Sequence, residues 1–227
     1  MPIRVGFIGC GNIASTHMRL LARDSRARIA GVYDISGERA RAAGAPAFDS
    51  AEALLEAVDA VYITLPNRLH AAQATAALER GKHVFCEKPM GVTREEVDTL
   101  EAAAARAATV FQVGHNRRFA PVYQKVKAVL EDMPALAGEF KMNRGELESP
   151  PWTADDAVTG GYLFETPIHI FDMARFLMGE CVEVTARAEK LVYPTLDTFT
   201  ALLCFASGRS ATFLSCAYAG WSFPFER

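Results

Sequence analysis

A lysine beside a proline is the first feature of the sequence that can do chemistry. The segment VFCEKPMG (84–91) begins as an apolar, strand-like run and ends with Glu87, Lys88 and Pro89. A proline restricts the residue before it to extended conformations, so the direction of Lys88 is fixed. A partly desolvated ammonium group in such a position can hold a substrate oxygen or stabilise developing alkoxide charge. The alternative is a surface salt bridge between Lys88 and Glu87.

A second group of ionisable side chains lies in an apolar segment of the second half of the chain. Glu165, His169 and Asp172 are spaced i, i+4 and i+7, which would place them on one stripe of a helix. His169 is a candidate general base, because imidazole titrates near neutral pH. The alternative is a hydrogen-bonded helix histidine. A helix that begins only at Thr166 or Pro167 would leave Glu165 outside it.

A glycine-rich turn follows the first strand-like run, with Gly9, Gly11 and Ala14 in the pattern GxGxxA. Gly9 permits a tight turn, Gly11 lets a pyrophosphate approach the backbone, and Ala14 lets the helix pack close to the sheet. Asp34 ends the second strand, where an acid binds ribose hydroxyls and repels a 2′-phosphate. The alternative is a glycine turn with a solvated aspartate. The pattern favours NAD over NADP, although Arg39 and Arg41 leave NADP open, and it predicts these binding residues: Gly9, Gly11, Asn12, Ile13, Ala14 and Asp34.

Strand-like and helical patterns alternate through the first half of the chain. A capping box, Thr93 and Glu96, opens one of the helices. Strands that alternate with helices and lack a polar face predict a parallel sheet covered on both sides. The strand-like runs are 3–9, 28–34, 59–66, 83–89 and 109–115.

The pattern changes after about residue 121. A helix near 122–131, a strand GEFKMNRGEL, a helix near 162–178 and three further strands are expected, the last two joined by a hairpin turn at SGR. The fold class expected is α/β, with an N-terminal doubly wound parallel sheet of Rossmann type at 1–121. A substrate-binding α+β domain with a mostly antiparallel sheet follows at 122–227. Its small number of strands predicts a truncated chain.

Composition narrows the class of partner. Half of the 227 residues are apolar, and the formal net charge is -3 with no block of Lys and Arg, which argues against nucleic acid and anionic membranes. No apolar run reaches about 18 residues and no signal peptide begins the chain, so we expect a cytoplasmic protein. Five dispersed cysteines predict reduced core residues, and the dispersed His and Cys predict no metal site.

Four motifs, in order along the chain, resemble those of the Gfo/Idh/MocA oxidoreductases, named for glucose-fructose oxidoreductase and inositol dehydrogenase. The likeness runs over essentially the whole chain, although the family normally continues well past residue 227. Glu165 and Pro167 depart from the family pattern, which has Asp and Gly there. The motifs are NIASTH (12–17), TLPNRLH (64–70), EKP and GGYLFETPIHIFDMARFLMG (160–179).

The resemblance implies an NAD(P)-dependent oxidoreductase that transfers hydride between the nicotinamide and a secondary alcohol of a sugar, sugar derivative or cyclitol. It implies that Lys88 is the catalytic lysine, and it implies a homodimer or homotetramer. Asn67 would face the cofactor, although a helix cap explains it almost as well. The cofactor side of the site would include Leu65, Pro66, Asn67, His70, Glu87 and Lys88.

The segment GHNRRFAP (114–121) resembles the family segment that borders the substrate pocket. His115, Arg117 and Arg118 can bind hydroxyls, a carboxylate or a phosphate, and structural salt bridges between domains are the alternative. Trp152 can offer a stacking face to a sugar ring. Two other functions stay open: an enzyme that uses NAD transiently for hydrolysis or epimerisation, and a non-catalytic dinucleotide-binding protein or fragment.

Overall fold

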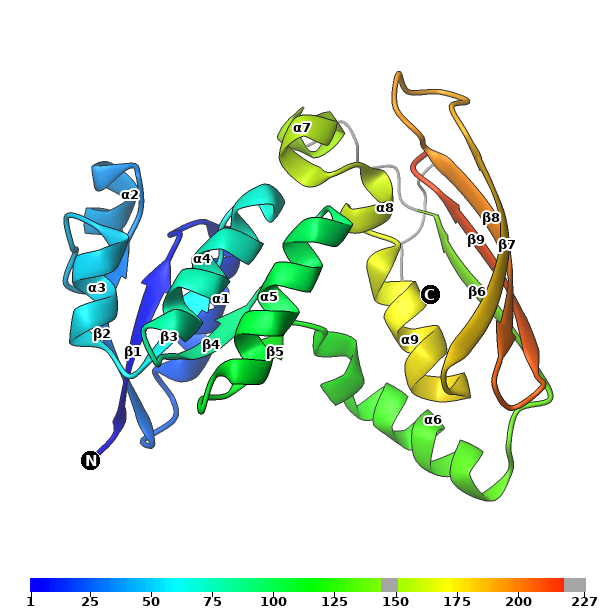
Figure 1. Cartoon of the computed structure of the whole chain (residues 1–227), viewed down its shortest axis with the longest axis horizontal. Helices are drawn as coiled ribbons and strands as arrows, with labels where there is room; N and C mark the ends of the chain where they lie inside the picture. Colours follow the sequence, from blue (N-terminus) through cyan, green and yellow to red (C-terminus); the bar gives the residue numbers. More distant parts are fainter. Residues whose placement is uncertain (144–150, 219–227) are drawn as a thin grey trace. The chain divides into compact units, whose positions relative to one another are not determined.

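The chain forms two compact units, which Figure 1 shows in order of sequence colour. The computed structural model describes residues 1–143 and 151–218. The units are Met1–Gly114 and His115–Arg227. The division precedes the segment 115–121, which the sequence pattern grouped with the first domain.

The first unit is built on a five-stranded sheet in the order β2-β1-β3-β4-β5. All neighbouring strands are parallel, as the alternating pattern predicts. The chain leaves β1 toward β2 on one side and then returns to β3 on the other, so the direction of winding reverses between β1 and β3. The strands are β1 (Ile3–Ile8), β2 (Ala27–Tyr33), β3 (Ala60–Ile63), β4 (His83–Cys86) and β5 (Phe111–Val113).

Helices cover both faces of this sheet because successive strand side chains point to opposite sides. Val5 and Phe7 of β1 pack with α1 (Asn12–Leu21) and α2 (Gly37–Ala42). Ile8 packs on the other face, with the helices that follow later in the chain. The short, polar α2 was not predicted. The helices of the Ile8 face are α3 (Ala51–Ala57), α4 (His70–Glu79) and α5 (Arg94–Arg106), and a short 3-10 turn, η1 (Asn67–Leu69), precedes α4.

The second unit contains a four-stranded sheet in the order β6-β9-β8-β7. β9 pairs antiparallel with β8 and parallel with β6, so the sheet is mixed but mostly antiparallel, as expected. The predicted strand GEFKMNRGEL is confirmed as far as Asn143, and its remainder lies outside the described residues. The strands are β6 (Ala137–Asn143), β7 (Cys181–Glu189), β8 (Thr198–Phe205) and β9 (Ser210–Cys216).

One long helix packs on this second sheet (Figure 1). Ile170, Ala174 and Met178 of α9 (Ile168–Met178) are buried against strand residues such as Leu203 and Phe205. The remaining helical elements are η2 (Asn116–Phe119), α6 (Pro121–Asp132), η3 (Pro151–Ala154), α7 (Asp156–Thr159) and α8 (Tyr162–Glu165).

The helix expected near 162–178 is broken in the structure. α8 ends at Glu165, and Pro167 is the N-cap of α9. Proline is tolerated at a helix start because the first N–H groups have no intrahelical partner. The prediction of one stripe with Glu165 is therefore wrong, and the alternative that the helix begins near Pro167 is confirmed.

Side-chain caps fix where three helices of the first unit begin. Thr93 and Glu96 form the predicted capping box of α5, and Ser36 and Ser50 cap α2 and α3. α5 has 13 residues. Throughout the described ranges, none of the helices has the length and apolar character needed to cross a membrane.

We expect Thr93→Ala to lower the free energy of unfolding by about 1 kcal/mol, because the Glu96 N–H loses its acceptor. Urea denaturation followed by circular dichroism measures this change. Thr99→Ala is the matched control, since Thr99 is exposed inside the same helix and alanine has the higher helix propensity there. Equal losses in the two variants would contradict the assignment of the cap.

Candidate functional site

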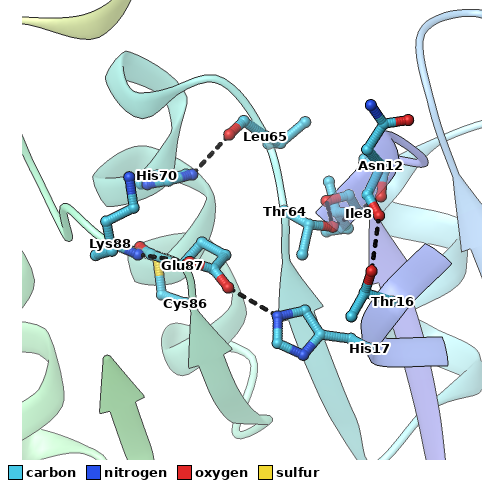
Figure 2. Close-up of polar contacts among 11 residues, drawn as sticks. Ile8, Asn12, Thr16, His17, Thr64, Leu65, His70, Cys86, Glu87 and Lys88 are labelled. Atoms are coloured by element: carbon cyan, nitrogen blue, oxygen red, sulfur yellow. Dashed lines mark hydrogen bonds and ion pairs between the residues drawn. The ribbon is translucent and has the colours of Figure 1, made fainter. Parts of the chain in front are cut away.

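Three loops of the first unit come together at the carboxyl ends of β1, β3 and β4 (Figure 2). The hydroxyl of Thr64, just after β3, donates a hydrogen bond of 2.7 Å to the carbonyl of Gly9, just after β1. The N–H of Glu87, just after β4, donates to the carbonyl of Ile63 at 3.0 Å. Ligands of open α/β sheets bind at this edge, next to the point where the winding reverses.

Glycine occupies two positions of the first loop, and the structural reason differs between them. Gly9 has φ of 95°, and a Cβ atom there would lie 2.4 Å from the carbonyl oxygen of Thr64. No other residue fits without moving the backbone. Gly11 has an ordinary φ of -79°, and a Cβ there would meet nothing within 4 Å. The fold therefore requires Gly9, whereas the space over Gly11 is open to a ligand.

The first turn of α1 suits a bound anion. Gly11 is the N-cap and supplies no side-chain hydrogen bond, and the first turn carries no acidic residue. The N–H groups of Asn12 and Ile13 thus keep the partial positive charge of the helix start. Ala14 is fully buried against the sheet, in the packing position predicted for it.

Asp34 binds the main chain of the glycine loop. One carboxylate oxygen accepts the N–H of Cys10 at 2.8 Å, and the other accepts the N–H of Ser36 at 2.8 Å. Arg39 lies 3.1 Å from the same carboxylate. Burial alone would raise the pKa of Asp34, but the two N–H groups and the guanidinium outweigh it and lower the pKa. Asp34 is therefore ionised at neutral pH and already oriented.

Cys10 does not behave as a nucleophile in this loop. Burial, followed by the charge of Asp34, raises the pKa of its thiol to about 11. The thiolate is the reactive form of cysteine, so this residue stays an unreactive thiol at neutral pH. The structure describes all five cysteines as free.

The loops after β3 and β4 are joined by a buried histidine. The His70 ring lies 2.7 Å from the carbonyl of Leu65 through Nε2 and 2.6 Å from that of Pro89 through Nδ1. Burial lowers its pKa, against the raising effect of the two carbonyls. The observed partners of His70 are thus main-chain atoms of both loops, and its contact with a cofactor stays a prediction.

Leu65, Pro66 and Asn67 follow β3 on the same edge. Asn67 is buried, and the N-caps of η1 and α4 are Pro66 and Leu69. Asn67 is thus the first residue of η1, and its contact with a cofactor and the alternative of a helix cap both stay predictions.

Lys88 and Glu87 extend from the end of β4 on the same edge. The bond between Lys88 and Pro89 is cis. Glu87 accepts a hydrogen bond of 3.2 Å from the N–H of Lys88 through Oε2, and its Oε1 lies 2.7 Å from Nε2 of His17 on α1. Figure 2 shows Glu87 between these two partners. Neither contact with Glu87 involves the amine of Lys88.

A buried carboxylate organises the candidate residues of the second unit. Asp172 accepts hydrogen bonds from Arg118, with Nε 2.9 Å from both oxygens and Nη2 2.6 Å from Oδ1. His115 Nδ1 lies 3.9 Å from the other oxygen. Arg118 also lies over the ring of Phe176. These contacts give Arg118 a structural salt bridge inside the second unit, where a bridge between domains had been the alternative.

The remaining predicted residues occupy neighbouring elements of the same unit. His169 lies in the first turn of α9, three residues before Asp172, and Glu165 ends α8. Arg117 lies in η2, and the exposed Trp152 lies in η3. Among the described residues, no three His, Cys, Asp or Glu side chains are grouped so that they could hold a metal ion.

Two pairings at this edge were not predicted. They are His17 with Glu87, and Arg39 with Asp34. His17 follows Ala14 by three residues, so helical spacing alone places it near the face that packs on the sheet. That spacing is the signal that could have indicated it.

We expect Gly9→Ala and Gly11→Ala to fail in different ways. Gly9→Ala should cost roughly 3 kcal/mol of folding free energy, because it combines a positive φ with a clash. Gly11→Ala should cost at most about 1 kcal/mol yet weaken NAD binding by about tenfold or more. Thermal unfolding and calorimetric titration with NAD separate the two effects. Normal NAD affinity in Gly11→Ala would contradict a pyrophosphate over this residue.

Both units of the chain resemble known proteins. Residues 3–115 match the family described as "Oxidoreductase family, NAD-binding Rossmann fold", and residues 132–224 match "GFO/IDH/MocA C-terminal domain". The uncharacterized oxidoreductase YrbE of Bacillus subtilis (strain 168) is 31% identical over 223 residues, which cover 92% of this chain and 65% of YrbE. An inositol 2-dehydrogenase of Rhizobium meliloti (strain 1021) is 33% identical over 226 residues, which cover 93% of this chain and 68% of the relative.

A solved structure shows the same fold. The crystal structure of an NAD-binding protein from Listeria innocua matches with a TM-score of 0.87 at 29% identity, covering 99% of this chain and 70% of that one. The chain thus spans about two thirds of the length of these relatives, 65% in the case of YrbE. The chain belongs to the Gfo/Idh/MocA family of oxidoreductases, and its first unit is the NAD-binding Rossmann domain of that family.

Proposed function

We propose that the protein is an NAD-dependent dehydrogenase that oxidises a secondary alcohol of a sugar, sugar derivative or cyclitol. The observation that carries the proposal is the meeting of the glycine loop, Asp34 and the Lys88 loop at one edge of the parallel sheet. NAD, when bound, supplies the acceptor for the hydride. The chain must then bind the cofactor, hold the alcohol and remove its proton.

The first unit would bind the cofactor and steady the reacting oxygen. The N–H groups of α1 receive the pyrophosphate, and Asp34 accepts hydrogen bonds from the adenosine ribose. The remaining predicted contacts are Leu65, Pro66, Asn67, His70 and Glu87. Lys88 donates to the alcohol oxygen and stabilises the negative charge that develops there as the proton leaves.

The second unit would supply the general base and the substrate wall. His169 accepts the hydroxyl proton while the hydride leaves the substrate carbon. Glu165, at the end of α8, assists His169 in this proton transfer. His115 and Arg117 hold substrate oxygens, and Trp152 offers a stacking surface. Asp172 acts by holding Arg118, to which it is hydrogen-bonded.

The substrate class rests on the relatives. An inositol 2-dehydrogenase is among them, which supports a polyol such as a cyclitol or sugar. The comparisons favour neither of the two alternatives, an enzyme that uses NAD transiently for hydrolysis or epimerisation and a non-catalytic dinucleotide-binding protein or fragment. A cytoplasmic location and a homodimer or homotetramer stay predictions.

We expect Lys88→Met to lower kcat/KM by on the order of 100- to 1,000-fold, because one donor to the developing oxyanion is lost. His169→Ala should lower it by on the order of 100- to 10,000-fold, because the general base is lost. NADH formation at 340 nm with a panel of cyclitols and sugars measures both.

Matched controls carry the same substitutions elsewhere. Lys125→Met changes an exposed lysine of α6, and His83→Ala changes a histidine at the opposite end of β4 from Lys88. Both should keep wild-type turnover within about twofold, because neither residue has a role in the proposed reaction and surface changes cost little. Thermal unfolding checks the fold of His83→Ala, because His83 Nδ1 accepts the N–H of Val110. Activity that survives in Lys88→Met and His169→Ala would overturn the assigned roles.

We expect Asp34→Ala to shift the ratio of NADP to NAD affinity by about tenfold or more toward NADP, which corresponds to 1.4 kcal/mol. The carboxylate that repels a 2′-phosphate is removed, and Arg39 loses its partner and can bind the phosphate. Calorimetric titration with each cofactor measures the ratio. The double variant with Arg39→Ala is the control and should lose the gain for NADP. An unchanged ratio in Asp34→Ala would contradict this role for Asp34.

A further inference from the structure

The hydrogen bond between His17 and Glu87 has no part in the proposed chemistry, although it lies beside Lys88. Nε2 of His17 is 2.7 Å from Oε1 of Glu87, across 70 residues of sequence. The two side chains are 20% and 13% exposed. An ionised carboxylate only accepts hydrogen bonds, so Nε2 of His17 is the donor.

Aromatic packing fixes the His17 ring on the sheet. Phe7, Tyr62 and Phe85 are aligned across β1, β3 and β4, and their neighbouring ring centroids are 4.8 and 4.6 Å apart. The His17 ring lies 5.4 Å from Tyr62 and 5.2 Å from Phe85. Such ring pairs restrict the orientation of the imidazole. The donor is thus held toward Glu87 by contacts separate from the hydrogen bond itself.

The other carboxylate oxygen of Glu87 binds the main chain of Lys88. Oε2 accepts the N–H of Lys88 at 3.2 Å. Gly114, after β5, leaves room for the carboxylate on one side, since a Cβ atom there would lie only 3.2 Å from the same oxygen. One carboxylate therefore connects α1 directly to the main chain of Lys88 (Figure 2).

We infer that His17 is a positioning residue that holds the Lys88 backbone through Glu87. The inference rests on the proposed function for its effect on turnover. His17 touches neither Lys88 nor the reacting atoms in this scheme. Its helix is the one whose first turn would bind the cofactor, so the pair couples the cofactor-binding helix to the lysine loop.

The direct test reads the Lys88 amide in the full chain by NMR. Selective ¹⁵N-lysine labelling gives six backbone signals, and Lys88→Arg identifies the one of interest. His17→Phe keeps the aromatic packing but removes the donor, and His17→Gln keeps an N–H donor. Thr16→Ala is the control, because the Thr16 hydroxyl donates to the carbonyl of Asn12 within its own helix. The lysines are Lys82, Lys88, Lys125, Lys127, Lys141 and Lys190.

We expect His17→Phe to shift the Lys88 amide signal and to speed its hydrogen exchange by roughly tenfold, the scale of one lost hydrogen bond. His17→Gln and Thr16→Ala should stay near wild type. An unchanged Lys88 amide in folded His17→Phe, or equal changes in His17→Phe and His17→Gln, would overturn the inference. If His17→Phe does not fold, Glu87→Gln provides the test, since an amide has one acceptor where the carboxylate has two. It should disturb the same signal, and an undisturbed signal would overturn the inference.

Kinetics separate this inference from the proposed function. With a substrate found in the panel above, His17→Phe should lower kcat by about tenfold, the equivalent of 1.4 kcal/mol, with the KM for NAD within about twofold. A changed amide with unchanged kcat would overturn the positioning role. A changed amide in a protein that shows no dehydrogenase activity would leave the structural link standing and reject the proposed function instead.

Discussion

The close approach between Gly9 and Thr64 is the constraint on which the candidate site depends. The Thr64 hydroxyl binds the Gly9 carbonyl, and the Thr64 carbonyl leaves no room for a side chain at Gly9. This contact holds the carboxyl ends of β1 and β3 close together. The start of α1 and the loops of Asn67 and Lys88 then all begin from one rigid edge.

Local features of the sequence predicted much of this arrangement. The strand segments, the Thr93 cap and the packing role of Ala14 were each predicted from a pattern of residues within a few positions of one another. The hairpin at SGR followed from turn chemistry, and β8 and β9 are indeed antiparallel neighbours around Gly208.

Other features depend on contacts that no local pattern contains. The pairs Arg118–Asp172 and His17–Glu87 join residues 54 and 70 positions apart. The break between Glu165 and Ile168 was open to two interpretations, because the heptad-like spacing of the acids and the proline pointed in opposite directions. Backbone geometry decided between them: α8 ends at Glu165, and its C-cap, Thr166, has φ of -118°.

The fixed carboxylate of Asp34 has a thermodynamic consequence for ligand association. Both of its oxygens accept hydrogen bonds from main-chain N–H groups of the protein itself. A side chain that is already immobile has little rotamer entropy left to lose when it meets a ligand. In the role proposed for Asp34, ribose recognition would therefore be preorganised, and its selectivity would arise from charge and shape and not from an adjustment of the side chain.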